Sequence, residues 1–129
     1  MPALSSPFTE YLALVDKTLR DSPFVNDFQT QHEDRGEVWF LRVNVYFIDN
    51  SLLHFRELFV GQENPFKKTY TYYYQRENGT MVFRYDNAPH FPHLPTAPNH
   101  KHIGETEVIA ADAPDLQSVL KEIEALIKA

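Results

Sequence analysis

The fold is decided by residues 37–60, which read EVWFLRVNVYFIDNSLLHFRELFV. From Glu37 onward, apolar side chains recur at every second position, which is the spacing of a strand with one buried face. A turn at Asp49 and Asn50 separates this strand from a second one at residues 52–60, and so short a turn predicts an antiparallel hairpin. The apolar row of the first strand consists of Trp39, Leu41, Val43, Val45 and Phe47.

Two more strands are predicted further along the chain. Residues 67–76 form a tyrosine-rich strand. Asn78 and Gly79 favour a type I′ hairpin turn because both tolerate a positive φ, and residues 80–87 then pair back. The sequence therefore predicts an antiparallel meander of four strands, to which residues 107–110 add a short fifth strand at one edge.

Helices are predicted at both ends of the chain. Residues 7–20 begin with a proline, follow the candidate caps Ser5 and Ser6, and place their apolar side chains on one face. The C-terminal helix begins after Pro114 and has a similar stripe. The first stripe consists of Phe8, Tyr11, Leu12, Val15 and Leu19, and the second of Leu116, Val119, Leu120, Ile123, Leu126 and Ile127.

The other segments show no strand pattern. Phe24, Val25 and Phe28 indicate a short second helix or a turn, and residues 30–36 and 61–65 are predicted to be loops. Helices packed on one face of an antiparallel sheet define the α+β class, which is the fold class that we expect.

The composition is typical of a globular protein. At roughly 150 residues per domain, a chain of 129 residues is expected to form a single domain over residues 1–129. The longest apolar run has five residues, whereas a transmembrane helix needs ~20. The start of the chain lacks the pattern of a secretory signal, and the absence of cysteine excludes disulfides, thiolate metal sites and cysteine nucleophiles. We expect a cytoplasmic protein.

Charge is distributed unevenly. The net charge is −6, but residues 67–102 contain five cations and two acids, a net charge of +3, which leaves −9 for the rest of the chain. The same segment holds four of the six histidines, whose imidazoles titrate near pH ~6.5. An acidic protein with one cationic, histidine-rich face is typical of a local site, although chance separation of the charges explains the pattern equally well.

Residues 88–104 contain four prolines and no periodicity, which predicts a long functional loop held in place by proline rigidity. Its histidines, His90, His93, His100 and His102, have three uses. They could bind zinc, nickel or copper, they could transfer protons near cations that stabilise a phosphorane, or they could fasten the loop to the sheet through hydrogen bonds.

Polar side chains on the strands suggest a site on one face of the sheet. Arg84 and Asp86 alternate with an apolar row and are expected to face away from the core. A sheet face with tyrosine and arginine can bind phosphate and stack bases, or it can be a solvated face with cross-strand ion pairs. Glu57 interrupts the apolar row Leu53, Phe55 and Phe59, which indicates a functional carboxylate, a salt bridge with an arginine, or a strand with both faces covered.

Two sequence blocks resemble a known family. Residues 83–90 read FRYDNAPH, residues 94–96 read LPT, and residues 100–104 read HKHIG. Together with the Leu-x-x-Val-Leu-x-x-Ile helix at residues 116–123, they resemble the TumE family of toxins from bacterial and archaeal toxin–antitoxin systems. The resemblance extends from about residue 37 to the end of the chain. It implies a small cytoplasmic toxin that is encoded beside its antitoxin.

The chemistry of the matched residues predicts an endoribonuclease. RNA supplies its own nucleophile, the 2′-hydroxyl, so that neither a metal nor another cofactor is needed. Arg84 and Lys101 are expected to bind the scissile phosphate, and Tyr72 or Tyr74 to stack a base. Two of the three histidines would act as general base and general acid, and the aspartate would orient a histidine or pair with Arg84. These catalytic candidates are His90, His100, His102 and Asp86.

A non-catalytic binding protein is the alternative, and its histidine-rich loop would then be structural or bind a metal ion. In either case, an antitoxin with an acidic segment is expected to cover Arg84 and Lys101. RNA is the expected substrate and no membrane is involved. A homodimer through an edge strand or through the C-terminal helix is left open by the sequence.

Overall fold

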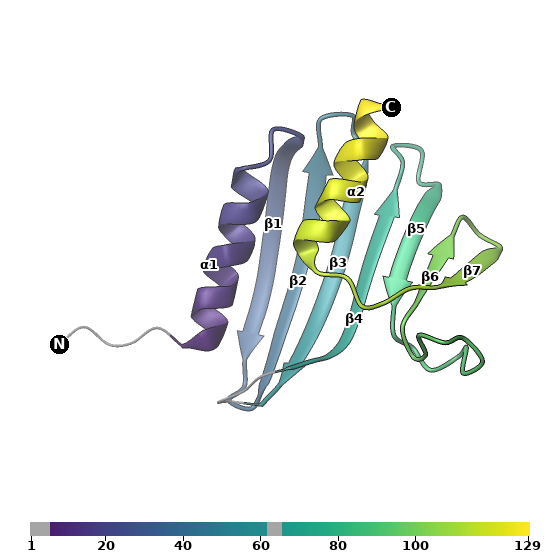
Figure 1. Cartoon of the computed structure of the whole chain (residues 1–129). Coiled ribbons are helices and arrows are strands. Elements are labelled where there is room, and N and C mark those ends of the chain that lie inside the picture. Colours follow the sequence, from purple (N-terminus) through teal and green to yellow (C-terminus); the bar gives the residue numbers. More distant parts are fainter. Residues whose placement is uncertain (1–5, 62–65) are drawn as a thin grey trace.

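A computed structural model describes residues 6–61 and 66–129, and within these residues two helices lie over one face of a seven-stranded sheet (Figure 1). Each strand pairs antiparallel with the next strand in the sequence, so the sheet is a continuous meander. The strands are β1 (Val25–Asp34), β2 (Val38–Phe47), β3 (Leu52–Val60), β4 (Phe66–Gln75), β5 (Met81–Asp86), β6 (His100–Ile103) and β7 (Glu107–Ala110). The α+β class is confirmed, but the predicted count of four to five strands is too low.

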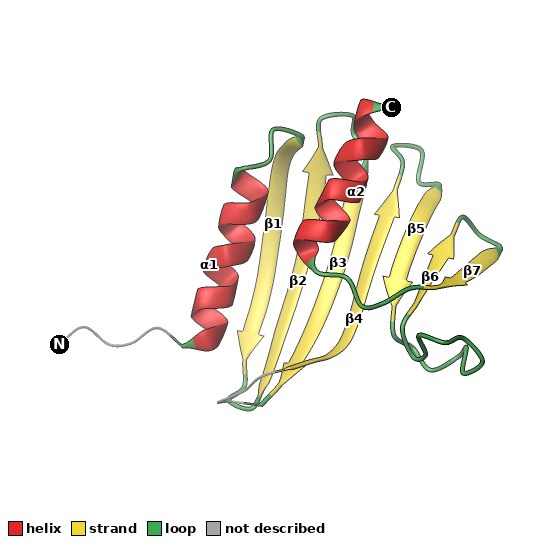
Figure 2. Cartoon of the chain, in the orientation of Figure 1, coloured by secondary structure: helices red, strands yellow, loops and turns green. Residues whose placement is uncertain are grey.

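The two helices, α1 (Pro7–Arg20) and α2 (Leu116–Lys128), both cover the same face of the sheet, as predicted (Figure 2). The Ser6 hydroxyl caps α1 by accepting a hydrogen bond from the Thr9 backbone amide, whereas Ser5 lies outside the described residues. Asp115 and Ser118 form a capping box at the start of α2. Most of the predicted loop at residues 61–65 also lies outside the described residues.

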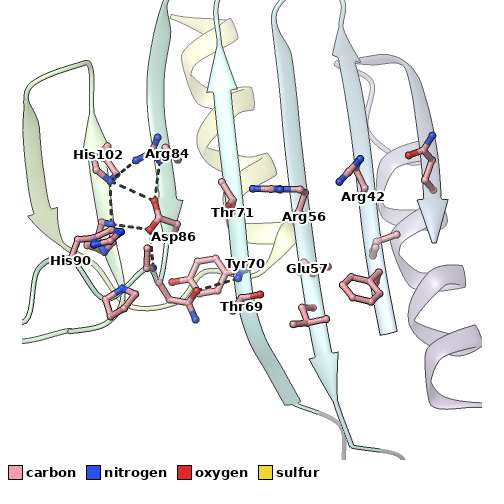
Figure 3. Close-up of a pocket in the computed structure, with 18 of the residues that line it drawn as sticks. Arg42, Arg56, Glu57, Thr69, Tyr70, Thr71, Arg84, Asp86, His90 and His102 are labelled. Atoms are coloured by element: carbon pink, nitrogen blue, oxygen red, sulfur yellow. Dashed lines mark hydrogen bonds and ion pairs between the residues drawn. The ribbon is translucent and has the colours of Figure 1, made fainter. Parts of the chain in front are cut away.

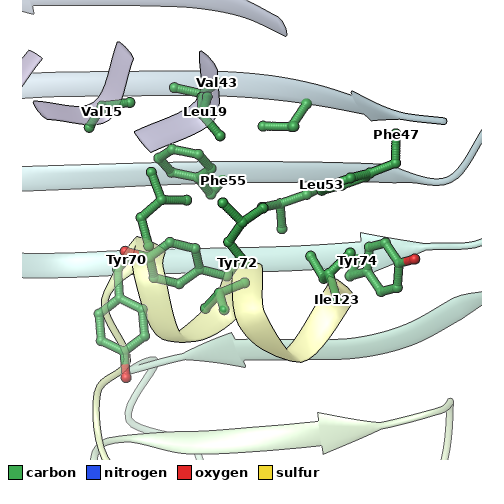
Figure 4. Close-up of a cluster of buried hydrophobic side chains, with 14 of the residues drawn as sticks. Val15, Leu19, Val43, Phe47, Leu53, Phe55, Tyr70, Tyr72, Tyr74 and Ile123 are labelled. Carbon is green, nitrogen blue, oxygen red and sulfur yellow. The ribbon is translucent and has the colours of Figure 1, made fainter. Parts of the chain in front are cut away.

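The core lies between the helices and the inward-facing rows of the central strands. Phe55 and Tyr72 stack in its centre with ring centroids 5.3 Å apart, and Ile123 of α2 packs in the same cluster (Figure 4). Burial of each large apolar side chain stabilises the fold by ~1.5–3 kcal/mol. Because β2 to β5 alternate apolar and polar residues, their other face carries polar side chains away from the core.

β1 replaces the short helix or turn and the polar loop that were predicted for residues 24–36. It pairs with β2 along almost its full length, from Val25 opposite Phe47 to Asp34 opposite Trp39. β1 is an edge strand, and charged and polar side chains are common on exposed edges. Its polar sequence was therefore a misleading signal for a loop.

β6 corrects the prediction of one continuous loop over residues 88–104. Residues 100–103 pair with β5 on one side and with β7 on the other, so that only the proline-rich part before His100 is loop. Hydrogen bonds to two neighbouring strands hold this short histidine- and lysine-containing segment in a strand conformation. The predicted edge strand at residues 107–110 is confirmed as β7.

Candidate functional site

The sheet face opposite the helices is hollowed into a groove of about 1170 Å³, called the sheet groove below (Figure 3). Strands from β1 to β6 line it, together with the loop that follows β5. Its lining includes the cations Arg35, Arg42, Arg56 and Arg84 and the imidazoles of His90, His100 and His102. The groove therefore combines positive charge with groups that transfer protons near neutral pH.

Four side chains form a cluster at the β5–β6 end of this groove, called the Asp86 cluster below. Strand register places Asp86 opposite His100 and Arg84 opposite His102. Because residues two apart on a strand face the same side, all four side chains meet on the open face of the sheet (Figure 3). The sequence placed Arg84 and Asp86 on the face away from the core, and strand register brings His100 and His102 to the same face.

Asp86 is the centre of the cluster. Its Oδ1 lies 2.9 Å from His100 Nε2 and accepts a hydrogen bond of 3.0 Å from the Ala88 amide. Its Oδ2 accepts a hydrogen bond of 3.0 Å from Arg84 Nε and lies 3.5 Å from His102 Nε2. Hydrogen bonds from charged donors to a carboxylate are strong, so Asp86 fixes the Arg84 guanidinium, and it also lies against both imidazoles.

His100 is buried, with 1% of its side chain exposed. Its Nδ1 lies 2.9 Å from the Pro98 carbonyl oxygen, which can only accept, so Nδ1 carries a proton. The Phe91 ring packs against the imidazole at 4.7 Å between centroids. A ring held by a carbonyl, a carboxylate and an aromatic neighbour does not reach substrate, and we assign His100 a positioning role.

His102 is the more accessible imidazole, with 16% of its side chain exposed. Arg84 Nη2 lies 3.0 Å from His102 Nε2, and because a guanidinium can only donate, Nε2 is the unprotonated acceptor of this hydrogen bond. Burial, and then the charge of Arg84, lowers the pKa of His102 below its ordinary 6.5. An unprotonated imidazole beside a guanidinium can accept a proton from a substrate that the guanidinium binds.

Two of the other sequence candidates, His90 and Lys101, lie on opposite faces of the sheet. His90 lines the sheet groove from the loop after β5 and is exposed. Lys101 lies between His100 and His102 in the strand and so faces the helices, where it pairs with Glu122 at 2.6 Å. The prediction that Lys101 binds the same phosphate as Arg84 is therefore wrong, and one acidic segment of an antitoxin cannot cover both.

Tyr72 and Tyr74 were predicted to stack bases, and burial contradicts this. Both point into the core, with 0% and 3% of their surface exposed. The neighbouring Tyr73 lies on the open face, opposite Arg84 on one strand and His54 on the other. The alternation of side chains along β4 could have identified Tyr73 from the sequence, since a strand that buries Tyr72 and Tyr74 must turn Tyr73 outward.

Glu57 forms a separate cluster on the helix-covered face. Its carboxylate accepts hydrogen bonds from Tyr11 at 2.5 Å and from Tyr72, and it pairs with Lys67 at 2.8 Å. Burial and the negative charge of Glu57 raise the pKa of both phenols above their ordinary range. Of the three alternatives that the sequence left open, the structure has the salt bridge, but its partner is a lysine rather than an arginine.

The Asp86 cluster also has the atoms that a metal ion would need. One ligand atom each from Asp86, His100 and His102 lies within 4.8 Å of the other two. However, Arg84 donates to two of these residues at 3.0 Å, and a cation placed between them would have to displace that guanidinium. Among the described residues, no buried polar side-chain atom is left without a hydrogen-bond partner. The geometry therefore favours a hydrogen-bonded network over a metal centre.

These observations define a class of protein: a small α+β chain whose sheet carries a cationic, imidazole-containing site on its open face. The family model described as "Toxin TumE" matches residues 15–127, and the chain belongs to this toxin family. It is the toxin of a toxin–antitoxin system, and an antitoxin is its partner. No curated protein and no solved structure matches it. In the part of the chain that the structure describes, neither helix is long and apolar enough to cross a membrane.

Proposed function

We propose that this toxin acts in the cytoplasm as a metal-independent endoribonuclease, with the Asp86 cluster as its active site. The observation that carries the proposal is the contact between Arg84 Nη2 and His102 Nε2 on the wall of a cationic groove. An anion-binding guanidinium and an unprotonated imidazole at 3.0 Å are the two groups that phosphodiester transfer to an internal hydroxyl requires.

Phosphate binding and base activation are coupled in this arrangement. The guanidinium of Arg84 has the fork geometry that binds phosphate oxygens in pairs. When it turns to the scissile phosphate, its hydrogen bond to His102 is lost and the Nε2 lone pair becomes free. Substrate binding would thus release the base at the moment when it is needed.

The reaction follows from these positions. His102 Nε2 takes the proton of the 2′-hydroxyl, and the 2′-oxygen attacks phosphorus. The bond between phosphorus and the 5′-oxygen breaks, and the leaving 5′-oxygen receives a proton from His90 on the groove lining. The products are a 2′,3′-cyclic phosphate and a 5′-hydroxyl end. Asp86 positions Arg84 and His100 beside His102, and Arg84 offsets the charge that develops on the phosphate oxygens.

The experiment uses the purified chain and an end-labelled oligoribonucleotide. We expect cleavage in the presence of a chelator, and no cleavage of the DNA of the same sequence because it lacks the 2′-hydroxyl. His102→Ala should abolish cleavage, whereas His93→Ala, an exposed histidine outside the groove lining, should retain it. The acid limb of the rate profile should lie below pH 6.5, since the pKa of His102 is lowered.

Expression in a bacterial host extends the test to the cell. Growth arrest with fragmented RNA, both lost in His102→Ala, supports the proposal. Arrest with intact RNA contradicts RNA cleavage while leaving the toxin class unchanged. Cleavage that stops on chelation and returns with added zinc or nickel contradicts the metal-independent mechanism.

A further inference from the structure

Two arginines of the sheet groove face each other without an acidic partner. Arg42 on β2 lies directly opposite Arg56 on β3, and both are exposed on the open face (Figure 3). Among the described residues, neither forms a salt bridge with a carboxylate, unlike the paired arginines Arg20, Arg35 and Arg84. Like charges directly opposite each other destabilise a sheet, so the pair carries a cost that folding does not explain.

The arginine pair lies in line with the Asp86 cluster. Strand register places Arg56 opposite Thr71, Thr71 opposite Asp86, and Asp86 opposite His100. With strands ~4.8 Å apart, the Arg56 backbone is about 10 Å from that of Asp86. In Figure 3 the Arg56 side chain extends toward Thr71, so the charged groups follow one row across the sheet.

Aromatic rings flank this row on the same face. Tyr73 lies opposite both His54 and Arg84, and Phe40 is 39% exposed two residues before Arg42. Rings beside cations are the surface on which single-stranded nucleic acids stack their bases while their phosphates are bound. The bases of a duplex are paired and stacked already, so they would not reach these rings.

We propose that Arg42 and Arg56 bind a second phosphate of a single-stranded RNA that runs across the strands of the sheet from the Asp86 cluster. This inference rests on the proposed function, because it takes Arg84 as the site of the scissile phosphate. The unpaired charges are then retained for the substrate rather than for the fold. In keeping with this, burial and the charges of Arg56 and Arg42 lower the pKa of His54, which lies two residues before Arg56 on β3.

Binding of a labelled single-stranded oligoribonucleotide to the His102→Ala chain, followed by fluorescence anisotropy, separates binding from cleavage. Replacing both Arg42 and Arg56 with alanine should weaken binding about 10- to 100-fold at low salt. The slope of log Kd against log salt should fall by roughly 0.7 for each phosphate contact that is lost. Arg76→Ala is the matched control, because it removes an exposed arginine at the β4–β5 turn and should leave binding unchanged.

Stability provides the second measurement. Removal of a repulsive pair should raise Tm, so the double variant should bind RNA more weakly while unfolding at a higher temperature. A loss of binding with a lower Tm would indicate a structural role and overturn the proposal.

Four further outcomes decide the matter. Unchanged RNA affinity in the double variant overturns the proposal, and so does a double variant that loses only its antitoxin, since the pair would then be a protein interface. Equal binding of duplex RNA overturns the single-strand geometry. If the parent chain cleaves nothing but its RNA affinity depends on both arginines, the proposed nuclease fails while the RNA-binding surface stands.

Discussion

A carboxylate-centred cluster lies on each face of the sheet, around Glu57 and around Asp86, and these two clusters differ in what surrounds the carboxylate. Glu57 lies beneath the helices with none of its side chain exposed, and its partners are two phenols and a lysine. Asp86 lies on the opposite face with 9% of its side chain exposed, and its partners are two imidazoles and a guanidinium. Both carboxylates are fully hydrogen-bonded, so burial of a carboxylate alone does not distinguish a site from a structural cluster.

The partners make that distinction. The pKa values of Tyr11 and Tyr72 are raised above an already high ordinary value, so these phenols keep their protons at any physiological pH. Imidazoles change charge near neutrality, and His102 opens onto a groove that a substrate can enter. We therefore infer that the Glu57 cluster stabilises the fold, whereas the Asp86 cluster has the features expected of the proposed active site.

The largest expected effect is on cleavage in the Asp86 cluster. Because His102→Ala removes a general base, it should lower the rate of RNA cleavage by about 10²- to 10⁴-fold. Circular dichroism and thermal unfolding should show a folded chain, since His102 is partly exposed and lies outside the core. A variant that retains the parent rate would place the chemistry elsewhere.

Substitution of Glu57 should lower the stability of the fold rather than the rate of cleavage. Glu57→Ala leaves Lys67 without its carboxylate and two phenols without their acceptor, which should cost ~3–5 kcal/mol of unfolding free energy. Urea unfolding measures this loss as a lower midpoint at a constant slope. The cleavage rate per folded molecule should stay at the parent value. A lower rate in the fully folded variant would show that the two faces are functionally coupled.

How far the sequence anticipates these two clusters depends on the strand that carries them. Alternation in β2 to β5 predicted the central strands, because one buried face leaves a period of two in the apolar residues. β1 was missed because an edge strand with few apolar residues lacks that period. β6 was missed because HKHI follows a proline-rich run, although the sequence did single out His100 and His102 as candidates.

The register of the strands could not be predicted from the sequence. Nothing in the composition shows that Asp86 lies opposite His100 and Arg84 opposite His102, since these pairings depend on where the loop between β5 and β6 ends. The same pairing turns Lys101 toward Glu122 and away from the site. An expectation of loop for this segment left the direction of Lys101 undetermined, and for that reason it was grouped with Arg84.

A smaller effect tests the structural role of the Glu57 cluster one hydrogen bond at a time. Tyr11→Phe deletes only the hydroxyl that donates to Glu57 at 2.5 Å. It should lower the unfolding free energy by about 1.5–3 kcal/mol, as expected for a hydrogen bond to a charged group. Tyr46→Phe is the matched control, because Tyr46 is exposed on the opposite face. Equal unfolding midpoints for the two variants would mean that the hydrogen bond from α1 to Glu57 does not contribute to stability.

The smallest expected effect is a change in the pKa of His54, which reports on the charges of the open face. That pKa is lowered by burial and, in addition, by the positive charges of Arg56 and Arg42. Removal of a neighbouring cation makes protonation easier, so Arg42→Ala should raise the pKa of His54 toward 6.5, while burial keeps it below that value. An NMR titration of the imidazole measures the shift.

A bound phosphate neutralises the same arginines, so a non-cleavable oligonucleotide should raise the pKa of His54 in the parent chain but have little effect when both arginines are alanine. A pKa that does not respond to Arg42→Ala would show that the arginine charges are screened by solvent and do not act across the open face.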